Sequence, residues 1–111
     1  MLRPQAHLFR AARRVRYNRL ISMKSEAQLR EELEAEGFSH TYVRQDRPNA
    51  HYSDHIHATV TAHIILDGEM ELTTKGTTTV YKKGDRCDVP AGAAHSAKMG
   101  PHGCRYLIGE R

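Results

Sequence analysis

Four histidines lie close together in the stretch HYSDHIHATVTAH, residues 51 to 63: His51, His55, His57 and His63. All four positions are odd-numbered, and side chains two residues apart on an extended strand point to the same side. Imidazole is the commonest metal ligand among protein side chains. The stretch therefore predicts a histidine-rich strand face, which is either a metal pocket or a hydrated surface.

The residues between these histidines favour the hydrated surface when they are considered alone. From residue 55 to 67 the odd positions read His, His, Thr, Thr, His, Ile, Asp, and the even positions from 56 to 66 read Ile, Ala, Val, Ala, Ile, Leu. Such alternation is typical of a half-buried strand. It predicts that the apolar even face packs into the core and that the histidines face water.

A second stretch, GDRCDVPAGAAH at residues 84 to 95, changes this interpretation. Gly84, Pro90, Gly92 and His95 follow the spacing G-x5-P-x-G-x2-H. Pro90 and Gly92 predict a tight turn. His95 then begins the next strand, aimed back across the sheet.

This second stretch resembles the second motif of the cupins, small metal-binding β-barrels, which reads G-x5-P-x-G-x2-H-x3-N. The match runs from Gly84 to His95, and Met99 replaces the final asparagine. The resemblance covers about residues 38 to 109. It implies an all-β fold, a cupin jelly-roll barrel or sandwich, preceded here by a short helix.

The first cupin motif, G-x5-H-x-H-x3,4-E-x6-G, is present in part. Asn49 stands at the first glycine, His55 and His57 at the two histidines, and Gly68 at the last glycine. Thr61 stands where the family has its glutamate. A neutral hydroxyl is a poor metal ligand, so the carboxylate of the family's site is missing from its usual position.

The resemblance implies a mononuclear divalent metal site formed by His55, His57 and His95, with Fe, Mn, Ni or Zn as candidate ions. Three imidazoles on one side of an ion leave open positions. His63, on the same odd-numbered face, is either a fourth ligand or a residue that supports the ligands or faces the substrate. We also assign Thr61 and two further residues, Cys87 and Met99, to the substrate pocket. No catalytic residue is assigned.

If the odd face points inward, the even face becomes the outer surface of the barrel. An exposed row of Ile56, Val60, Ile64 and Leu66 is a large apolar patch for a monomer. We therefore expect a homodimer that buries this row, as is common among cupins.

The chain divides into a basic extension at residues 1–22, a capping helix at 23–37 and a barrel at 38–111. Ser25 and Gln28 form a capping-box pattern, and Gly37 ends the helix. We interpret the helix as a solvated covering segment. Turns are expected at RPN (47–49), DG (67–68, a hairpin), KG (75–76), GD (84–85), PAG (90–92) and MGPHG (99–103).

The charge of the chain is unevenly distributed. Residues 1–22 carry six arginines and no acidic residue, while the rest carries eleven basic and thirteen acidic residues, a net charge of −2. This balance does not favour a nucleic-acid partner, and no apolar run is long enough for a membrane helix.

The extension, which we expect to be disordered, is a mitochondrial transit peptide, a basic arm, or a segment upstream of a start at Met23. A cytoplasmic location is expected, or a mitochondrial one with a transit peptide.

Two functions remain open at this point. The first is an enzyme whose metal binds a small organic substrate, as in cupin dioxygenases or isomerases. The second is a non-catalytic module that binds a small molecule in the barrel. A fold of this kind supports many activities, so the resemblance indicates the architecture better than the chemistry.

Overall fold

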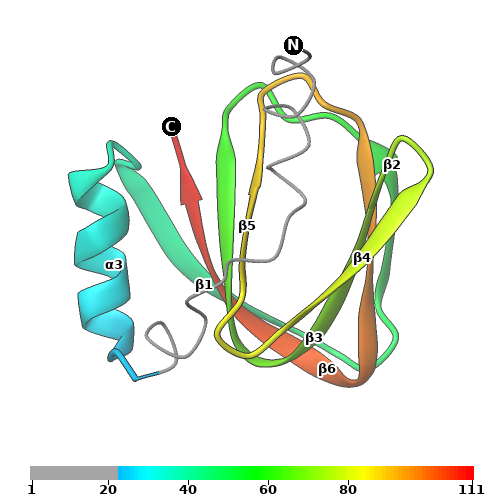
Figure 1. The fold of residues 1–111 in the computed structure, drawn as a ribbon, viewed down its shortest axis with the longest axis horizontal. Helices are drawn as coiled ribbons and strands as arrows, with labels where there is room; N and C mark the ends of the chain where they lie inside the picture. The colour runs from blue at the N-terminus through cyan, green and yellow to red at the C-terminus, as the bar shows by residue number, and fades with distance from the viewer. Residues whose placement is uncertain (1–22) are drawn as a thin grey trace, which may run out of the picture.

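The computed structural model describes residues 23–111, and the expectations for residues 1–22 lie outside this range. Within these described residues, one helix is followed by six strands (Figure 1). The elements are α3 (Glu26–Ala35), β1 (His40–Asp46), β2 (His51–His55), β3 (Thr61–Thr74), β4 (Thr77–Lys82), β5 (Arg86–Val89) and β6 (His95–Glu110). The described part contains no helix that is both long and apolar enough to cross a membrane.

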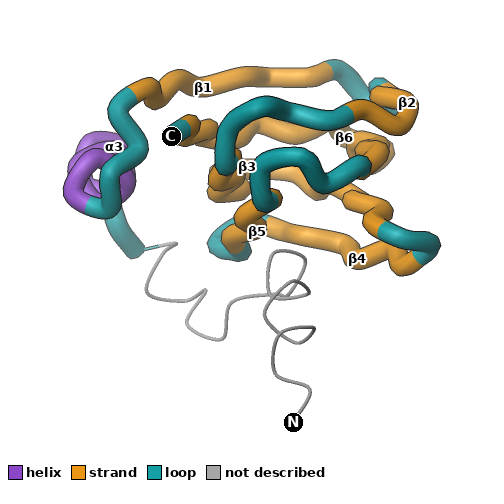
Figure 2. Tube along the Cα trace, turned by 90° about the horizontal axis from the view of Figure 1, so that it is seen from above, coloured by secondary structure: helices purple, strands orange, loops and turns teal. Residues whose placement is uncertain are grey.

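Two long strands, β3 and β6, are the centre of the fold. They pair with each other in antiparallel fashion, from Thr61 opposite Glu110 to Thr73 opposite Ser96. On its other side β6 pairs with β1 and β2, and β3 pairs with β5 and β4. The first half of β3 therefore belongs to one four-stranded layer with β1, β5 and the end of β6. Its second half belongs to another layer with β2, β4 and the start of β6, and the layers form a barrel (Figure 2).

The change from one layer to the other occurs at Gly68 and Gly103. The β3–β6 register shifts between Ile65 and Asp67 and again just after Gly68. Gly68 and Gly103 have φ angles of +80° and +82°. The expected hairpin at residues 67–68 is therefore wrong, because Gly68 lies in a strand that bends against a neighbouring backbone. The MGPHG stretch is likewise an irregular part of β6 and does not separate two strands.

The histidine-rich stretch is also not one strand. β2 ends at His55, residues 56–60 form a connection, and β3 begins at Thr61. The register of β2 against β6 is irregular between Tyr52 and His55. The expected single strand face is therefore wrong, because the chain leaves the sheet after His55 and joins it again on the far side of β6.

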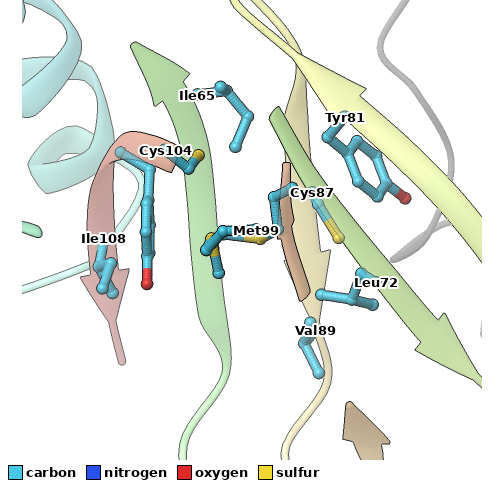
Figure 3. Close-up of a cluster of buried hydrophobic side chains, with 10 residues drawn as sticks. Ile65, Leu72, Tyr81, Cys87, Val89, Met99, Cys104 and Ile108 are labelled. Carbon is cyan, nitrogen blue, oxygen red and sulfur yellow. The ribbon is translucent and has the colours of Figure 1, made fainter. Parts of the chain in front are cut away.

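The interior of the barrel is apolar where the two layers face each other. Figure 3 shows side chains from several strands converging there. The cluster consists of Ile65, Met70, Leu72, Tyr81, Cys87, Val89, Met99, Cys104, Tyr106 and Ile108. On β3, odd positions point inward before the bend and even positions after it, as Thr61 and Leu72 illustrate. The bend therefore keeps both halves of a long strand facing the same interior.

A second apolar cluster lies between the outer surface of the barrel and α3. It consists of Leu29, Leu33, Phe38, Ala62, Ile64 and Leu107, with Val43, Val60 and Leu66 partly buried against it. Ile64 is only 3% exposed. The expected exposed row is therefore wrong, since α3 covers most of it within the same chain. Ile56, in the connection after β2, is 63% exposed. The homodimer stays a prediction, but the exposed apolar row no longer supports it.

Helix α3 begins as the sequence predicts. The Ser25 side chain accepts a hydrogen bond from the Gln28 backbone, and the Gln28 side chain accepts one from the Ser25 backbone. Arg86 joins the helix end to the barrel through paired hydrogen bonds to Glu36 at 2.7 and 2.9 Å. The helix is more than a solvated cover, because two of its leucines are fully buried.

Two glycines offer a matched test of the bend. Gly68 and Gly76 both have a φ angle of +80°, but a Cβ atom on Gly68 would lie 2.1 Å from the Gly103 carbonyl oxygen, whereas one on Gly76 would meet nothing within 4 Å. Gly76→Ala should cost about 1 to 2 kcal/mol for the left-handed conformation alone. Gly68→Ala should cost more, by at least about 2 kcal/mol, because the strands must also separate. Urea unfolding of both variants measures the difference, and equal costs would contradict the tight contact.

The packing of α3 against the barrel gives a second prediction. Leu33 is 0% exposed, so Leu33→Ala should lower the free energy of unfolding by about 2 to 5 kcal/mol. Its exposed neighbour Glu34 is the control, and Glu34→Ala should change stability by less than about 0.5 kcal/mol. A Leu33→Ala variant as stable as the wild type would show that the helix does not stabilise the barrel.

Candidate metal centre

Three histidines converge at one end of the barrel. His55 ends β2, His57 lies in the connection that follows, and His95 begins β6. His55 and His95 are direct partners across the β2–β6 ladder. One ring nitrogen from each of the three residues lies within 4.8 Å of the others. The ring centroids are 4.3 Å (55–95), 4.8 Å (55–57) and 5.1 Å (57–95) apart.

The turn at residues 90–92 holds the connection after β2 in place. The Gly92 backbone N–H donates to the His57 carbonyl at 2.9 Å, and the Ala93 N–H donates to the Pro90 carbonyl at 3.3 Å. Gly92 has a φ of +78°, a conformation that favours glycine. The two sequence motifs are thus bonded to each other through their backbones, which fixes His57 next to His95.

Backbone carbonyls orient two of the three imidazoles. His55 Nδ1 lies 2.7 Å from the Ser53 carbonyl oxygen, and His95 Nδ1 lies 3.1 Å from the Ala93 carbonyl oxygen. A carbonyl can only accept a hydrogen bond, so Nδ1 carries the proton in both rings. Each Nε2 then has a free lone pair, which is the usual arrangement of histidines that bind metals.

The surroundings of His57 and His95 favour the neutral form of these two imidazoles. Burial lowers the pKa of His57, and the nearby His55 lowers it further, while the Glu110 carboxylate acts in the opposite direction. Burial also lowers the pKa of His95, and the hydrogen bond to Ala93 partly offsets this. A metal ion competes with protons for imidazole nitrogens. The lowered pKa values therefore keep these two imidazoles neutral and able to bind a cation.

The dimensions of the cluster suit a transition metal. Metal–nitrogen distances of about 2.1 Å and angles between 90° and 109° place imidazole centroids about 4.6 to 5.3 Å apart. The separations of 4.8 and 5.1 Å lie within this range, and the separation of 4.3 Å is slightly below it. The donor set, three imidazoles without a carboxylate in the same cluster, suits Fe, Ni, Cu or Zn. The residues present therefore fit a divalent metal ion.

The cluster opens into a cavity of about 430 Å³ inside the barrel. The cavity is lined by Tyr42, Arg44, Tyr52, Ser53, His55, His57, Thr61, His63, Met70, Leu72, His95, Ala97, Met99, Tyr106, Ile108 and Glu110. Pockets of this volume are typical of sites for small molecules. The lining combines polar side chains with apolar methionine, leucine and isoleucine side chains.

His63 also lines this cavity, but it lies outside the cluster of three. It is 8% exposed, and its Nδ1 donates to the Cys87 carbonyl oxygen at 3.3 Å. Its ring centroid is 6.1 Å from that of Tyr106. The structure thus brings together three of the four histidines assigned to the metal.

The three residues assigned to the substrate pocket have different positions. Thr61 and Met99 line the cavity. Cys87 is buried in the apolar core and is not among the lining residues. Burial raises the pKa of its thiol to about 12. Among the other histidines, His40, His51 and His102 are exposed.

The sequence analysis missed a polar network in the cavity wall. Asp46 accepts hydrogen bonds from Tyr106 at 2.7 Å, Tyr52 at 3.0 Å and Arg44 at 3.2 Å. Burial alone would raise the pKa of Asp46, but these hydrogen bonds outweigh it and the pKa is lowered. The ionised Asp46 carboxylate therefore holds the Arg44, Tyr52 and Tyr106 side chains, which line the cavity, in fixed positions.

Glu110 was also missed. It lines the cavity and accepts a hydrogen bond from the Tyr42 hydroxyl at 2.8 Å. The available signal was the alternation in the closing strand, where Tyr106, Ile108 and Glu110 share one face and Leu107 lies on the other.

Comparisons with known proteins agree with this geometry. No model of a protein family matches the chain, and no curated protein matches it. Among solved structures, an RmlC-like cupin from Shewanella frigidimarina is similar, with a TM-score of 0.58 and 21% identity over 63% of this chain and 62% of that chain. The DMSP lyase DddQ from Ruegeria pomeroyi has a TM-score of 0.59 and 25% identity over 64% of this chain and 36% of that chain.

A third similar structure is the Cnp3 cupin domain of Schizosaccharomyces pombe, with a TM-score of 0.59 and 25% identity over 63% of this chain and 50% of that chain. The chain spans less than two thirds of the length of each of these three structures. The neighbours also include KdgF from Halomonas and oxalate decarboxylase from Bacillus subtilis. The described part of the chain has the cupin fold, which supports the assignment of the chain to the cupin superfamily.

Proposed function

We propose that the chain holds one divalent metal ion on His55, His57 and His95, and that the ion acts on a small organic molecule in the adjoining cavity. The observation that carries this proposal is the convergence of three imidazoles, two of them oriented by backbone carbonyls, on a cavity of about 430 Å³. Structural neighbours that are enzymes, a DMSP lyase and an oxalate decarboxylase among them, support an enzymatic role.

Each part of the chain has a role in this proposal. The three histidines hold the ion, which supplies Lewis-acid chemistry or an oxygen-binding centre when it is bound. The apolar wall, to which Met70, Leu72 and Met99 contribute, takes the hydrophobic part of the ligand and excludes water. The hydroxyl groups of the tyrosines that line the cavity are held by Asp46 and Glu110 and orient the polar part of the ligand.

His63 has a separate role in this proposal. Its hydrogen bond to the Cys87 carbonyl fixes the proton on Nδ1. Nε2 is then an acceptor in the cavity wall, available to a hydroxyl or amide of the ligand. We therefore propose that His63 contacts the small molecule in the cavity and does not bind the metal ion.

A non-catalytic module that binds a small molecule without metal is the alternative. It would use the same cavity and the same tyrosines, but it would not need three imidazoles with free nitrogens. Metal content separates the two proposals before any substrate is known.

The full chain, purified without a histidine tag, should contain about one metal ion per molecule, since three imidazoles are sufficient protein ligands for a catalytic site. His57→Ala combined with His95→Ala should remove nearly all of it. Plasma mass spectrometry measures the content and identifies the metal.

The matched control is His51→Ala combined with His102→Ala, which also removes two imidazoles, but from exposed positions. This control should keep its metal. If the wild type contains none, even after incubation with Fe, Mn, Ni and Zn, the metal proposal fails and the non-catalytic module is favoured.

His63 gives a prediction about pH. Burial lowers its pKa from 6.5 to about 4 in the folded protein, although the hydrogen bond to Cys87 opposes this. Between these values the unfolded chain binds a proton on His63 and the folded chain does not. The free energy of unfolding therefore falls as the pH is lowered from about 6.5 to 4, by about 3 kcal/mol for this residue.

His63→Gln should remove about this much of the loss in stability on acidification. Urea unfolding at pH 7 and at pH 4, with a chelator present, measures it in both proteins. Equal pH dependence in the variant and the wild type would show that His63 is not a buried neutral group.

A further inference from the structure

The carboxylate that is missing from position 61 has a counterpart on the neighbouring strand. Thr61, on β3, stands where the cupin motif has its glutamate, and its direct partner on β6 is Glu110. Directly opposed residues in an antiparallel pair have Cβ atoms about 4.5 to 5.5 Å apart and point to the same face. Both residues line the cavity. A carboxylate is thus present on the correct face, one strand away from its usual position.

The position of Glu110 is fixed from several sides. Beyond the pair, the Val60 N–H donates to the Arg111 carbonyl at 2.9 Å, and the Arg111 N–H donates to the Val60 carbonyl at 3.1 Å. These two bonds prevent the end of β6 from slipping along β3. The Tyr42 hydroxyl donates to Glu110 Oε2 at 2.8 Å and holds the carboxylate inside the cavity.

The histidine cluster alone has no negative charge. Its three ligands are imidazoles, and within the described residues the cluster contains no carboxylate. A bound divalent ion would therefore keep its full charge of +2 in a partly buried site, which is electrostatically costly without a nearby anion. Asp46 is already paired with Arg44 at 3.2 Å, so its charge is largely compensated. Among the residues that line the cavity, Glu110 is the one with an acidic side chain.

We propose that Glu110 supplies the negative charge of this metal site, from β6, in place of the glutamate that Thr61 has replaced. This inference rests on the proposed function, because it requires that the three histidines bind a metal. The carboxylate of Glu110 would also affect which metal ion the site prefers. Imidazoles bind Mn²⁺ more weakly than Zn²⁺, and a carboxylate favours Mn²⁺. Mn²⁺ binding should therefore depend on Glu110 more than Zn²⁺ binding does.

Calorimetric titration of the chelator-treated full chain with MnCl₂ and with ZnCl₂ tests this proposal. Glu110→Gln keeps the shape of the side chain and removes its charge. It should weaken Mn²⁺ binding by about 10- to 100-fold, the usual effect of losing a group that supports metal ligands, and should weaken Zn²⁺ binding less. Glu71→Gln is the matched control, because Glu71 lies on β3 but does not line the cavity. It should leave both affinities unchanged.

A rescue variant guards against a trivial loss of folding. Thr61→Glu combined with Glu110→Gln returns one carboxylate to the same face from the opposite strand. It should recover most of the Mn²⁺ affinity. This recovery distinguishes a charge requirement at the site from general damage to β6.

The outcomes separate this inference from the proposed function. If Glu110→Gln binds Mn²⁺ as tightly as the wild type while His57→Ala with His95→Ala does not bind it, the role of Glu110 is wrong and the metal site stands. An equal loss in Glu71→Gln, or no recovery in the rescue variant, also overturns the role of Glu110. If the wild type binds neither metal, both proposals fail.

Discussion

The close approach of three backbones at one level of the barrel determines the rest of the structure. A Cβ atom on Gly68 would lie 2.1 Å from the Gly103 carbonyl oxygen, and one on Gly103 would lie 2.6 Å from the Asp46 carbonyl oxygen. β1, β6 and β3 therefore meet where no side chain fits between them. The two long strands bend together at this level, so each contributes to both layers. The bend brings the start of β6, with His95, opposite the end of β2, with His55.

Features that depend on neighbouring residues could be predicted from the sequence. The capping box of Ser25 and Gln28, the positive φ of 60° at Asn49 and the turn before His95 all arise within a few residues. The convergence of His55 and His57 with His95 could be inferred as well, because the motifs that contain them have characteristic spacings. The resemblance to cupins supplied the long-range part of that inference, which the residues alone left open.

Features that depend on distant contacts could not be predicted. The dipeptide at residues 67–68 has the composition of a hairpin, and only the carbonyl of Gly103 explains why a glycine is needed inside a strand. The alternation after His55 correctly predicts which face of β3 is apolar, but it does not show that α3 covers Ile64. Glu110 was missed for a related reason, since its place beside Thr61 depends on a β3–β6 register that no local pattern encodes.

The pairing of β1 with β6 has a consequence for the order in which the molecule forms. Among the described strands β1 pairs with β6 alone, and Asp46 of β1 accepts a hydrogen bond from Tyr106, sixty positions later. During synthesis β1 and β2 therefore leave the ribosome without their partner strand, whereas the local β3–β4 hairpin can close at once. Contacts so distant in sequence make folding slow, and unpaired strand edges are prone to aggregation in the meantime. The histidines of β2 and β6 can meet only after β6 has been synthesised, so the proposed metal site would form late in the production of the chain.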